Sequence, residues 1–255
     1  MDKAAKIALV TGGSRGLGRN MALKLAEKGN DVIITYQSQK NLAEEVVKEI
    51  AGMGRQAVAL SFDAGDIGAL DLFVKQVGQT LSEQWGRDRL DFLVNNAGIG
   101  ATIPFDKATE ADFDRFMNIH FKSVYFLCQK LLPGMNDKGR IINISTGTTR
   151  FANPGYSIYA SMKGAVEVFT RYLAKEIGAR GITVNVVAPG PVETDFNNAG
   201  IRNAPPERKN MLMSVTALGR IGQPDDIGGV VAWLCSEEAG WINGQRIEVS
   251  GGINL

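Results

Sequence analysis

A tyrosine and a lysine, Tyr159 and Lys163, are the residues of this sequence whose types and spacing best suit a joint chemical task. They stand four residues apart, so a helix places both side chains on one face. A free phenol has a pKa of about 10 and is a poor base at neutral pH. A nearby ammonium favours the phenolate and lowers that pKa. The pair is therefore predicted to exchange a proton with an alcohol or carbonyl oxygen.

A glycine-rich turn follows the apolar run at residues 7–10 and precedes an amphipathic stretch. Glycines at a strand-to-helix turn permit positive φ angles and a close approach of the backbone to a ligand. The free N–H groups of the following helix then favour a pyrophosphate. The spacing Gly12-x3-Gly16-x-Gly18 differs from G-x-G-x-x-G but has the same context, so it predicts a dinucleotide site, with a plain tight turn as the alternative. The residues assigned to this turn are Gly12, Ser14, Arg15, Gly16, Leu17 and Gly18.

The end of the second predicted strand, at residues 31–36, indicates which dinucleotide binds. An NAD site usually carries Asp or Glu at this place, whereas residues 35–40 read TYQSQK. Without a carboxylate nothing repels a 2′-phosphate, and Arg15 and Lys40 supply charges that can pair with it. The pattern favours NADP(H), unless both cations are only solvated surface charges. Tyr36, Ser38 and Lys40 are assigned to the cofactor site.

Short apolar runs alternate with longer amphipathic stretches along the chain. The predicted strands cover 7–10, 31–36, 57–62, 90–96, 139–145, 182–189 and 245–252. Strands without polar alternation indicate a sheet covered by helices on both faces. The alternation predicts one α/β domain over 1–255, a doubly wound, seven-stranded parallel sheet of the Rossmann-like kind. One irregular segment, within 189–216, is predicted to supply a substrate lid at about 191–216, with a solvated loop as the alternative.

Composition excludes several classes of function. The chain has 28 Lys plus Arg against 27 Asp plus Glu, which gives no reason to expect nucleic acid or a membrane surface as a partner. The start, MDKAAKIALVTGG, is not typical of a secretory signal. Cys128 and Cys235 are predicted to be buried free thiols in a reducing compartment, hence cytoplasmic. Because the sequence has a single histidine, His120, and no Cys-x-x-Cys, no metal is expected, and His120 is interpreted as a structural side chain on a helix.

Further short motifs extend along nearly the whole chain. They are Asn95-Asn96-Ala97-Gly98, Asn118, Tyr159-Ala160-Ser161-Met162-Lys163, Pro189-Gly190 and the closing Val249-Ser250-Gly251-Gly252. In this order, and together with the glycine turn, they resemble the short-chain dehydrogenase/reductase family, most like its 3-oxoacyl-(acyl-carrier-protein) reductase type. The resemblance implies hydride transfer between a nicotinamide cofactor and a carbonyl or alcohol carbon.

The resemblance also implies a catalytic group around the tyrosine. The family usually has a serine thirteen residues before the tyrosine, where this sequence has Thr146, whose hydroxyl can still donate a hydrogen bond. If the preceding strand ends one residue differently, Ser145 takes this role, because successive strand side chains alternate. Asn118, in a helix predicted over 111–130, is implied to hold a water in a proton path to Lys163; otherwise it only distorts the helix.

Cofactor contacts beyond the glycine turn follow from the same resemblance. Asp63 is implied to contact the adenine end, and Pro189, Gly190 and Thr194 are implied to hold the nicotinamide amide. The other positions assigned to the cofactor are Ala64, Asn95, Ala97, Gly98, Ser145, Tyr159, Lys163 and Val192. Asn, Gly and Pro at these places are otherwise ordinary turn residues.

Three functional hypotheses follow. The first is an NADP(H)-dependent oxidoreductase that reduces a ketone or 3-oxoacyl substrate to an alcohol. The second is a sugar or polyol dehydrogenase working in the oxidative direction. The third is an NADPH-binding sensor without turnover. By resemblance a homo-oligomer, dimer or tetramer, is expected, in which helices at 111–130 and 156–177 pair across one interface and the C-terminal strand region across another.

Overall fold

A parallel sheet of seven strands organises the protein, which is described by a computed structural model over residues 5–255. The strands are β1 (Ile7–Val10), β2 (Asp31–Tyr36), β3 (Ala57–Ser61), β4 (Leu90–Asn95), β5 (Met135–Ile144), β6 (Thr183–Pro189) and β7 (Arg246–Val249). Their order is β3-β2-β1-β4-β5-β6-β7, and every neighbouring pair is parallel. The predicted Rossmann-like sheet is confirmed. The order reverses between β1 and β4, which is where such sheets bind ligands.

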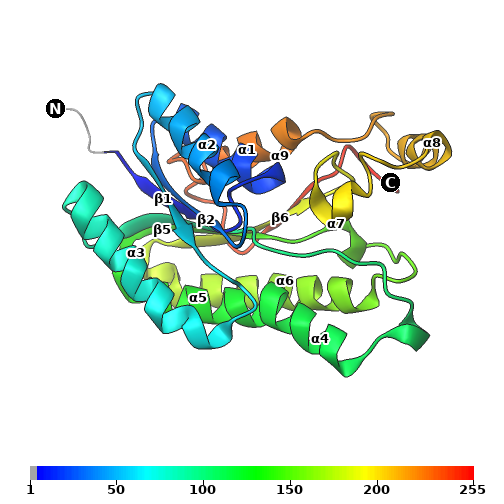
Figure 1. Cartoon of the computed structure of the whole chain (residues 1–255), viewed down its shortest axis with the longest axis horizontal. Coiled ribbons are helices and arrows are strands. Elements are labelled where there is room, and N and C mark those ends of the chain that lie inside the picture. Colours follow the sequence, from blue (N-terminus) through cyan, green and yellow to red (C-terminus); the bar gives the residue numbers. More distant parts are fainter. Residues whose placement is uncertain (1–4) are drawn as a thin grey trace.

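Helices connect the strands and cover both faces of the sheet (Figure 1). They are α1 (Gly16–Glu27), α2 (Lys40–Gly52), α3 (Leu70–Trp85), α4 (Glu110–Met117), α5 (Ser123–Leu131), α6 (Ser157–Ile177), α7 (Phe196–Ala199), α8 (Pro206–Ser214) and α9 (Pro224–Leu234). Short 3₁₀ turns occupy Ile67–Ala69, Phe105–Lys107, Leu132–Gly134, Gly147–Thr149 and Gly178–Arg180. In Figure 1, α1, α2 and α9 lie on one side of the sheet and α3 to α6 on the other.

The apolar residues of the central strands explain this layering. Along β1, Ile7 and Leu9 belong to the core on the α3–α6 side, whereas Ala8 and Val10 belong to the core on the other side. All four side chains are fully buried, as expected where side chains alternate between two covered faces. The sheet is therefore rigid at its centre, and the loops at the carboxyl ends of its strands have a fixed base.

Several predicted elements differ from the structure. The strand predicted over 139–145 begins at Met135, and the one predicted over 245–252 ends at Val249. The helix predicted over 111–130 is interrupted by a π-helical turn at Asn118–Lys122, in which the Ser123 N–H donates to the carbonyl oxygen of Asn118. The segment at 191–216 is not irregular throughout, because it contains α7 and α8; Pro206 begins α8, a position where its missing N–H costs nothing. Whether this segment acts as a lid stays a prediction.

The two cysteines are free and buried, as predicted. No helix within residues 5–255 is both long and apolar enough to cross a membrane. The same residues contain no cluster of three or more potential metal ligands of the His, Cys, Asp and Glu types. The predicted domain includes residues 1–4, which lie outside the described part of the chain.

Candidate active site

The glycine turn lies between β1 and α1, at the reversal point of the sheet. Gly12 and Gly16 have φ angles of +66° and +55°, in the left-handed region that favours glycine. At Gly18 a Cβ atom would collide with the carbonyl oxygen of Gly12 and lie 2.5 Å from Asn96 Nδ2. The backbone therefore packs too closely here for any side chain. This leaves the first N–H groups of α1 open toward a phosphate group.

Three polar side chains that sequence analysis did not single out hold this turn. Thr11 Oγ1 accepts hydrogen bonds from the N–H groups of Asn96, at 2.9 Å, and Ala97, at 3.0 Å. Asn96 Nδ2 donates to the Thr11 carbonyl oxygen at 2.9 Å, and the Gly12 N–H donates to Thr35 Oγ1 at 3.0 Å. The segments after β1 and β4 are thus joined, which fixes the dinucleotide cradle. The N-N-A-G motif was the available signal for Asn96.

The charges near this turn suit a phosphorylated ribose. Among residues 5–255, no hydrogen bond or ion pair engages the side chain of Arg15, which is exposed at the start of α1. Lys40 Nζ lies 3.7 Å from Glu44 Oε1, with 67% of its side chain exposed. Tyr36 is half-buried and Ser38 exposed at the carboxyl end of β2, where residues 35–40 include no carboxylate. The arrangement fits a 2′-phosphate better than a bare ribose hydroxyl.

Other predicted cofactor positions differ in where their side chains lie. Asp63 Oδ1 accepts from the Gly65 N–H at 2.8 Å and its Oδ2 from Gln37 Nε2 at 3.0 Å, so Asp63 shapes the turn after β3. Asn95 Nδ2 donates to Asn143 Oδ1 at 2.8 Å inside the sheet, so its side chain is turned into the sheet, and a contact of Asn95 with the cofactor stays a prediction. The remaining predicted cofactor positions differ in exposure. The buried ones are Ser14, Ala64, Pro189, Val192 and Thr194, the half-buried ones are Leu17, Ala97 and Gly190, and Gly98 is exposed.

Tyr159 and Lys163 come together on the first turns of α6, as predicted. Lys163 is buried, and its Nζ donates to the carbonyl oxygen of Ile144 at 2.7 Å and lies 6.0 Å from the centre of the Tyr159 ring. Burial lowers the pKa of Lys163 to about 8, because it disfavours the charged ammonium.

The pKa of Tyr159 corrects the expectation that the lysine lowers it. Burial raises this pKa to about 12, and the hydrogen bond with the Thr146 side chain offsets only part of the rise. Lys163 is not a cause of the shift, since its ammonium is turned to the Ile144 carbonyl oxygen. At neutral pH Tyr159 is therefore a phenol, ready to donate its proton rather than accept one.

The end of β5 decides which of two adjacent hydroxyls faces the tyrosine. The strand ends at Ile144, and Ser145 is buried with its Oγ donating to Glu167 Oε1 at 2.6 Å, away from Tyr159. Thr146 is the hydrogen-bond partner of Tyr159, and its Oγ1 also accepts from the Thr148 N–H at 3.3 Å. The Ser145 hydroxyl is used to hold Glu167, and its assignment to the cofactor stays a prediction.

Asn118 begins the π-helical turn, so it lies where the helix is distorted. No side-chain contact described within residues 5–255 joins it directly to Tyr159 or Lys163, and its role in holding a water in a proton path to Lys163 stays a prediction. His120, in the same turn, lies beside the tyrosine. Its ring meets that of Tyr159 edge-on, with centroids 5.1 Å apart, and its Nε2 lies 2.8 Å from the carbonyl oxygen of Ile99. The wider turn changes which side chains of this segment face α6.

His120 is a neutral imidazole in this setting. It is fully buried, and burial together with the charge of Lys163 holds its pKa well below the ordinary 6.5. Since a carbonyl oxygen only accepts, Nε2 carries the proton and donates to Ile99. Nδ1 is then a lone-pair acceptor that has no hydrogen-bond partner within the described residues. His120 is thus a buried side chain that holds backbone, as the sequence analysis expects of a structural histidine, but it lies in a π turn and beside Tyr159, which the sequence did not predict.

Aromatic rings surround the tyrosine on its open side. Phe196 of α7 and Tyr156 have ring centroids 6.2 Å and 6.3 Å from that of Tyr159. Phe196 also packs over Gly100, where a Cβ atom would lie 2.7 Å from its ring. The segment predicted as a lid thus places an apolar side chain, Phe196, beside the Tyr159 ring.

Comparison with known proteins agrees with this geometry. A family model described as Enoyl-(Acyl carrier protein) reductase matches residues 12–254. The hydroxynaphthalene reductase-like protein Arp2 of Metarhizium guizhouense (strain ARSEF 977) is 37% identical over 259 residues, which cover 98% of this chain and 95% of that protein. The 3-oxoacyl-(acyl-carrier-protein) reductase FabG of Staphylococcus aureus (strain Mu50) is 38% identical over 255 residues, with 99% and 100% covered.

Solved structures give the same result. The angucycline C-6 ketoreductase LanV with bound NADP superposes with a TM-score of 0.93 at 38% sequence identity, covering 98% of this chain and 96% of that one. A match of this quality along nearly the whole of both chains covers every strand and the candidate site. From the family model and these relatives together, the chain belongs to the short-chain dehydrogenase/reductase family.

Proposed function

We propose that the protein is an NADP(H)-dependent oxidoreductase that reduces a carbonyl group to an alcohol. The observation that carries the proposal is the convergence of the Tyr159 phenol, the Thr146 hydroxyl and the Lys163 ammonium next to the glycine turn. The cofactor is NADP(H), which supplies the hydride when bound. The exposed, unpaired Arg15 and the absence of a carboxylate at the end of β2 support NADP(H) over NAD(H).

The proton chemistry favours reduction. A phenol whose pKa is raised to about 12 holds its proton at neutral pH and can donate it to the alkoxide that develops on the substrate. Thr146 orients the same oxygen through its hydroxyl. Lys163 is placed to bind ribose hydroxyls and to supply positive charge beneath the phenol. His120 holds the Ile99 backbone beside Tyr159.

The surroundings of Tyr159 support a ketone on an apolar or aromatic skeleton as substrate. The rings of Phe196, Tyr156 and His120 lie around that of Tyr159, with centroids 5.1–6.3 Å away. The hydroxynaphthalene reductase-like and angucycline ketoreductase relatives are consistent with such a substrate. A 3-oxoacyl thioester, as for FabG, is the second candidate. Oxidation of a sugar or polyol is less favoured, because aromatic rings suit an apolar substrate better than a polyol.

The test is turnover of NADPH with a panel of aromatic ketones, 3-oxoacyl thioesters and sugars, followed by absorbance. Tyr159→Phe is expected to lower kcat by about 10²- to 10⁴-fold, because it removes the proton donor and keeps the ring. Tyr172→Phe is the matched control, since Tyr172 lies on the same helix with 67% exposure. Full turnover by Tyr159→Phe would contradict the assignment. Tight NADPH binding in calorimetry with no turnover on any substrate would favour the sensor hypothesis.

We also propose that the protein acts in the cytoplasm as a homo-oligomer. Two buried free thiols suit a reducing compartment. Apolar side chains remain exposed on α4 to α6, where the sequence analysis expects an interface. They are Phe113, Tyr125, Val168 and Tyr172. Trp241, near the C-terminal strand, is fully exposed and marks a second candidate contact.

A further inference from the structure

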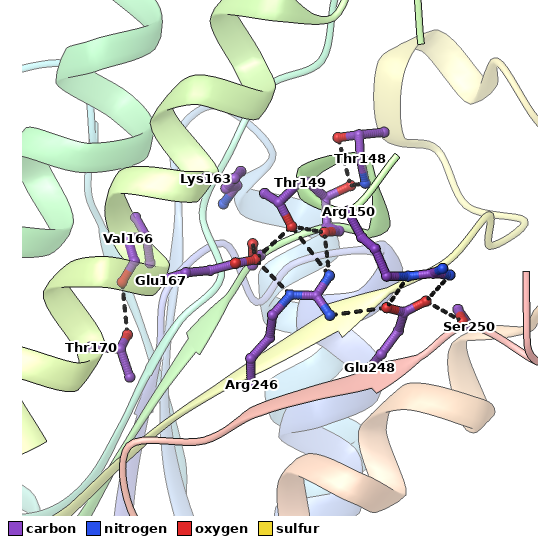
Figure 2. A network of polar contacts seen from close by, with 12 residues as sticks. Thr148, Thr149, Arg150, Lys163, Val166, Glu167, Thr170, Arg246, Glu248 and Ser250 are labelled. Carbon is purple, nitrogen blue, oxygen red and sulfur yellow. Dashed lines mark hydrogen bonds and ion pairs between the residues drawn. The ribbon is translucent and has the colours of Figure 1, made fainter. Parts of the chain in front are cut away.

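The loop that carries Thr146 is held from below by an arginine of β7. Arg246 Nη2 donates to the carbonyl oxygen of Thr146 at 3.1 Å and to Thr149 Oγ1 at 3.2 Å (Figure 2). The Thr146 hydroxyl itself has weaker support within the loop, since its contacts with Thr148 are 3.2 and 3.3 Å long. The direction of this hydroxyl therefore depends on where Arg246 fixes the backbone.

A single carboxylate oxygen ties the arginine, the loop and the catalytic helix together. Glu167 Oε1 accepts hydrogen bonds from Ser145 Oγ at 2.6 Å, Thr149 Oγ1 at 2.8 Å and Arg246 Nε at 2.9 Å (Figure 2). The side chains of Glu167 and Arg246 are only 13% and 23% exposed, so solvent screens this ion pair weakly. The loop is thus fixed on both sides of Thr146, at Ser145 and Thr149, by hydrogen bonds to the same Glu167 oxygen.

Glu167 belongs to the same helical face as the catalytic pair. Tyr159, Lys163 and Glu167 follow one another at intervals of four residues on α6, so they lie one above the other. The helix that places the phenol therefore also fixes, through Glu167 and Arg246, the loop that places the Thr146 hydroxyl. The Tyr159 oxygen and the Thr146 hydroxyl can therefore move apart only if this network breaks.

The outer half of the network anchors the arginine. Arg246 Nη1 donates to Glu248 Oε2 at 2.9 Å, and Arg150 binds the same carboxylate at 2.8 and 2.9 Å. Ser250 Oγ donates to Glu248 Oε1 at 2.8 Å. Arg150 also donates to the carbonyl oxygens of Ile253 and Asn254. β7 and the residues after it are thereby coupled to the loop after β5.

We infer that Arg246 and Glu167 are positioning residues for the reaction, which hold the Thr146 hydroxyl in register with the Tyr159 phenol. The inference rests on the proposed function and extends it to a network that touches neither substrate nor cofactor. Misplacement of a reacting group by about 1 Å costs on the order of 10²-fold in rate. Breaking the network is therefore expected to reduce kcat, with little change in NADPH affinity.

The test compares Arg246→Met, Arg246→Lys and Glu167→Gln with a matched control. Arg180→Met is that control, because Arg180 also donates to two backbone carbonyl oxygens, those of Leu132 and Met135, and pairs with Asp137 at the other end of the sheet. Arg246→Met is expected to lower kcat by about 10- to 100-fold and to change the Kd for NADPH by less than about threefold. Arg246→Lys should regain part of the loss, and Arg180→Met should keep the wild-type kcat.

A double-mutant cycle separates positioning from general stability. With Thr146→Ala as the background, Arg246→Met should lower kcat by less than about threefold, because the hydroxyl that it positions is gone. Independent, multiplicative effects of the two substitutions would overturn the inference, as would an unchanged kcat in Arg246→Met. If Arg246→Met does not fold, Glu167→Gln and Arg246→Lys complete the cycle. An inactive wild-type protein would overturn the proposed function, whereas an active one with additive effects overturns only this inference.

Discussion

At the scale of single residues, the site depends on which groups keep their protons after burial. Tyr159 stays a phenol because its pKa is raised to about 12, and His120 stays neutral because its pKa is held far below 6.5. Lys163, with a pKa lowered to about 8, is the group whose charge changes nearest to neutral pH. The reacting region thus contains one proton donor, one cation and one neutral imidazole.

His120 gives a prediction that joins catalysis to pH. His120→Leu removes the hydrogen bond to Ile99 and is expected to lower kcat/KM by about 10- to 100-fold, whereas His120→Asn, whose amide can still donate to that oxygen, should lose less. Because the folded pKa lies below the unfolded value, protonation favours the unfolded chain. The wild-type free energy of unfolding should be highest above pH 6.5 and decline below it, by at most about 1.4 kcal/mol per pH unit from this group.

Urea unfolding at pH values about one unit above and below 6.5 measures this effect. His120→Asn is the control that lacks the titrating group, so its free energy of unfolding should depend less on pH over that interval. Equal pH dependence in the two proteins would contradict the neutral, buried state of His120. Wild-type kcat/KM in His120→Leu would contradict its role beside Tyr159.

At the scale of elements, a second prediction follows from the close packing of Gly18, at the start of α1, against the Gly12 carbonyl oxygen after β1. Gly18→Ala introduces a methyl group at the Gly12 carbonyl oxygen, so α1 must shift. We expect a loss of about 1–3 kcal/mol in the free energy of unfolding and at least about tenfold weaker NADPH binding. Calorimetric titration and thermal unfolding measure both quantities.

Gly78→Ala is the control for that substitution. Gly78 lies inside α3 with no atom within 4 Å of its Cβ position, so alanine should stabilise the protein by about 0.5–1 kcal/mol and leave cofactor binding unchanged. If Gly18→Ala bound NADPH as tightly as the wild type, the cradle would not depend on this backbone contact.

At the scale of the whole molecule, the exposed apolar side chains of α4 to α6 predict association. Light scattering is expected to give the mass of a dimer or tetramer. Val168→Asp, which places a charge at the centre of this face, should lower that mass, while Leu72→Asp on α3 should not. Both residues are exposed in the single chain, at 45% and 71%, so neither substitution disturbs the core. A monomeric wild-type mass would exclude this interface.

The arrangement of strands and helices follows from local hydrophobic patterns, so the sequence was sufficient to predict the parallel, doubly wound sheet. Apolar runs form the buried parts of β1 to β6, helices alternate with the strands along the chain, and parallel order follows from that alternation. Tyr159 and Lys163 are four residues apart on one helix, so their proximity needed no tertiary information. The choice between Thr146 and Ser145 required only the last residue of β5.

The failures have a common physical origin in tertiary packing. The π turn at Asn118–Lys122, which brings His120 beside Tyr159, was missed because no residue in the helix marks such a turn and periodicity assumes 3.6 residues per turn. Asn95 points into the sheet because Asn143 is there to accept its hydrogen bond. The pKa of Tyr159 is raised because burial, which the sequence does not specify, outweighs the hydrogen bond with Thr146, while the Lys163 ammonium is turned to the Ile144 carbonyl oxygen. The contacts of Arg246 span about a hundred positions and leave no local pattern.

The wide turn at Asn118–Lys122 makes the core and the site sensitive to a deletion. A π turn holds one residue more than a regular α-helical turn, and removal of that residue restores regular winding. In this protein, loss of one residue there would rotate α5 against α4 by about 100°. Buried positions such as Leu127 would then face water, and the imidazole would leave the phenol. A one-residue deletion in this turn is therefore expected to be more damaging than most single substitutions in the same helix.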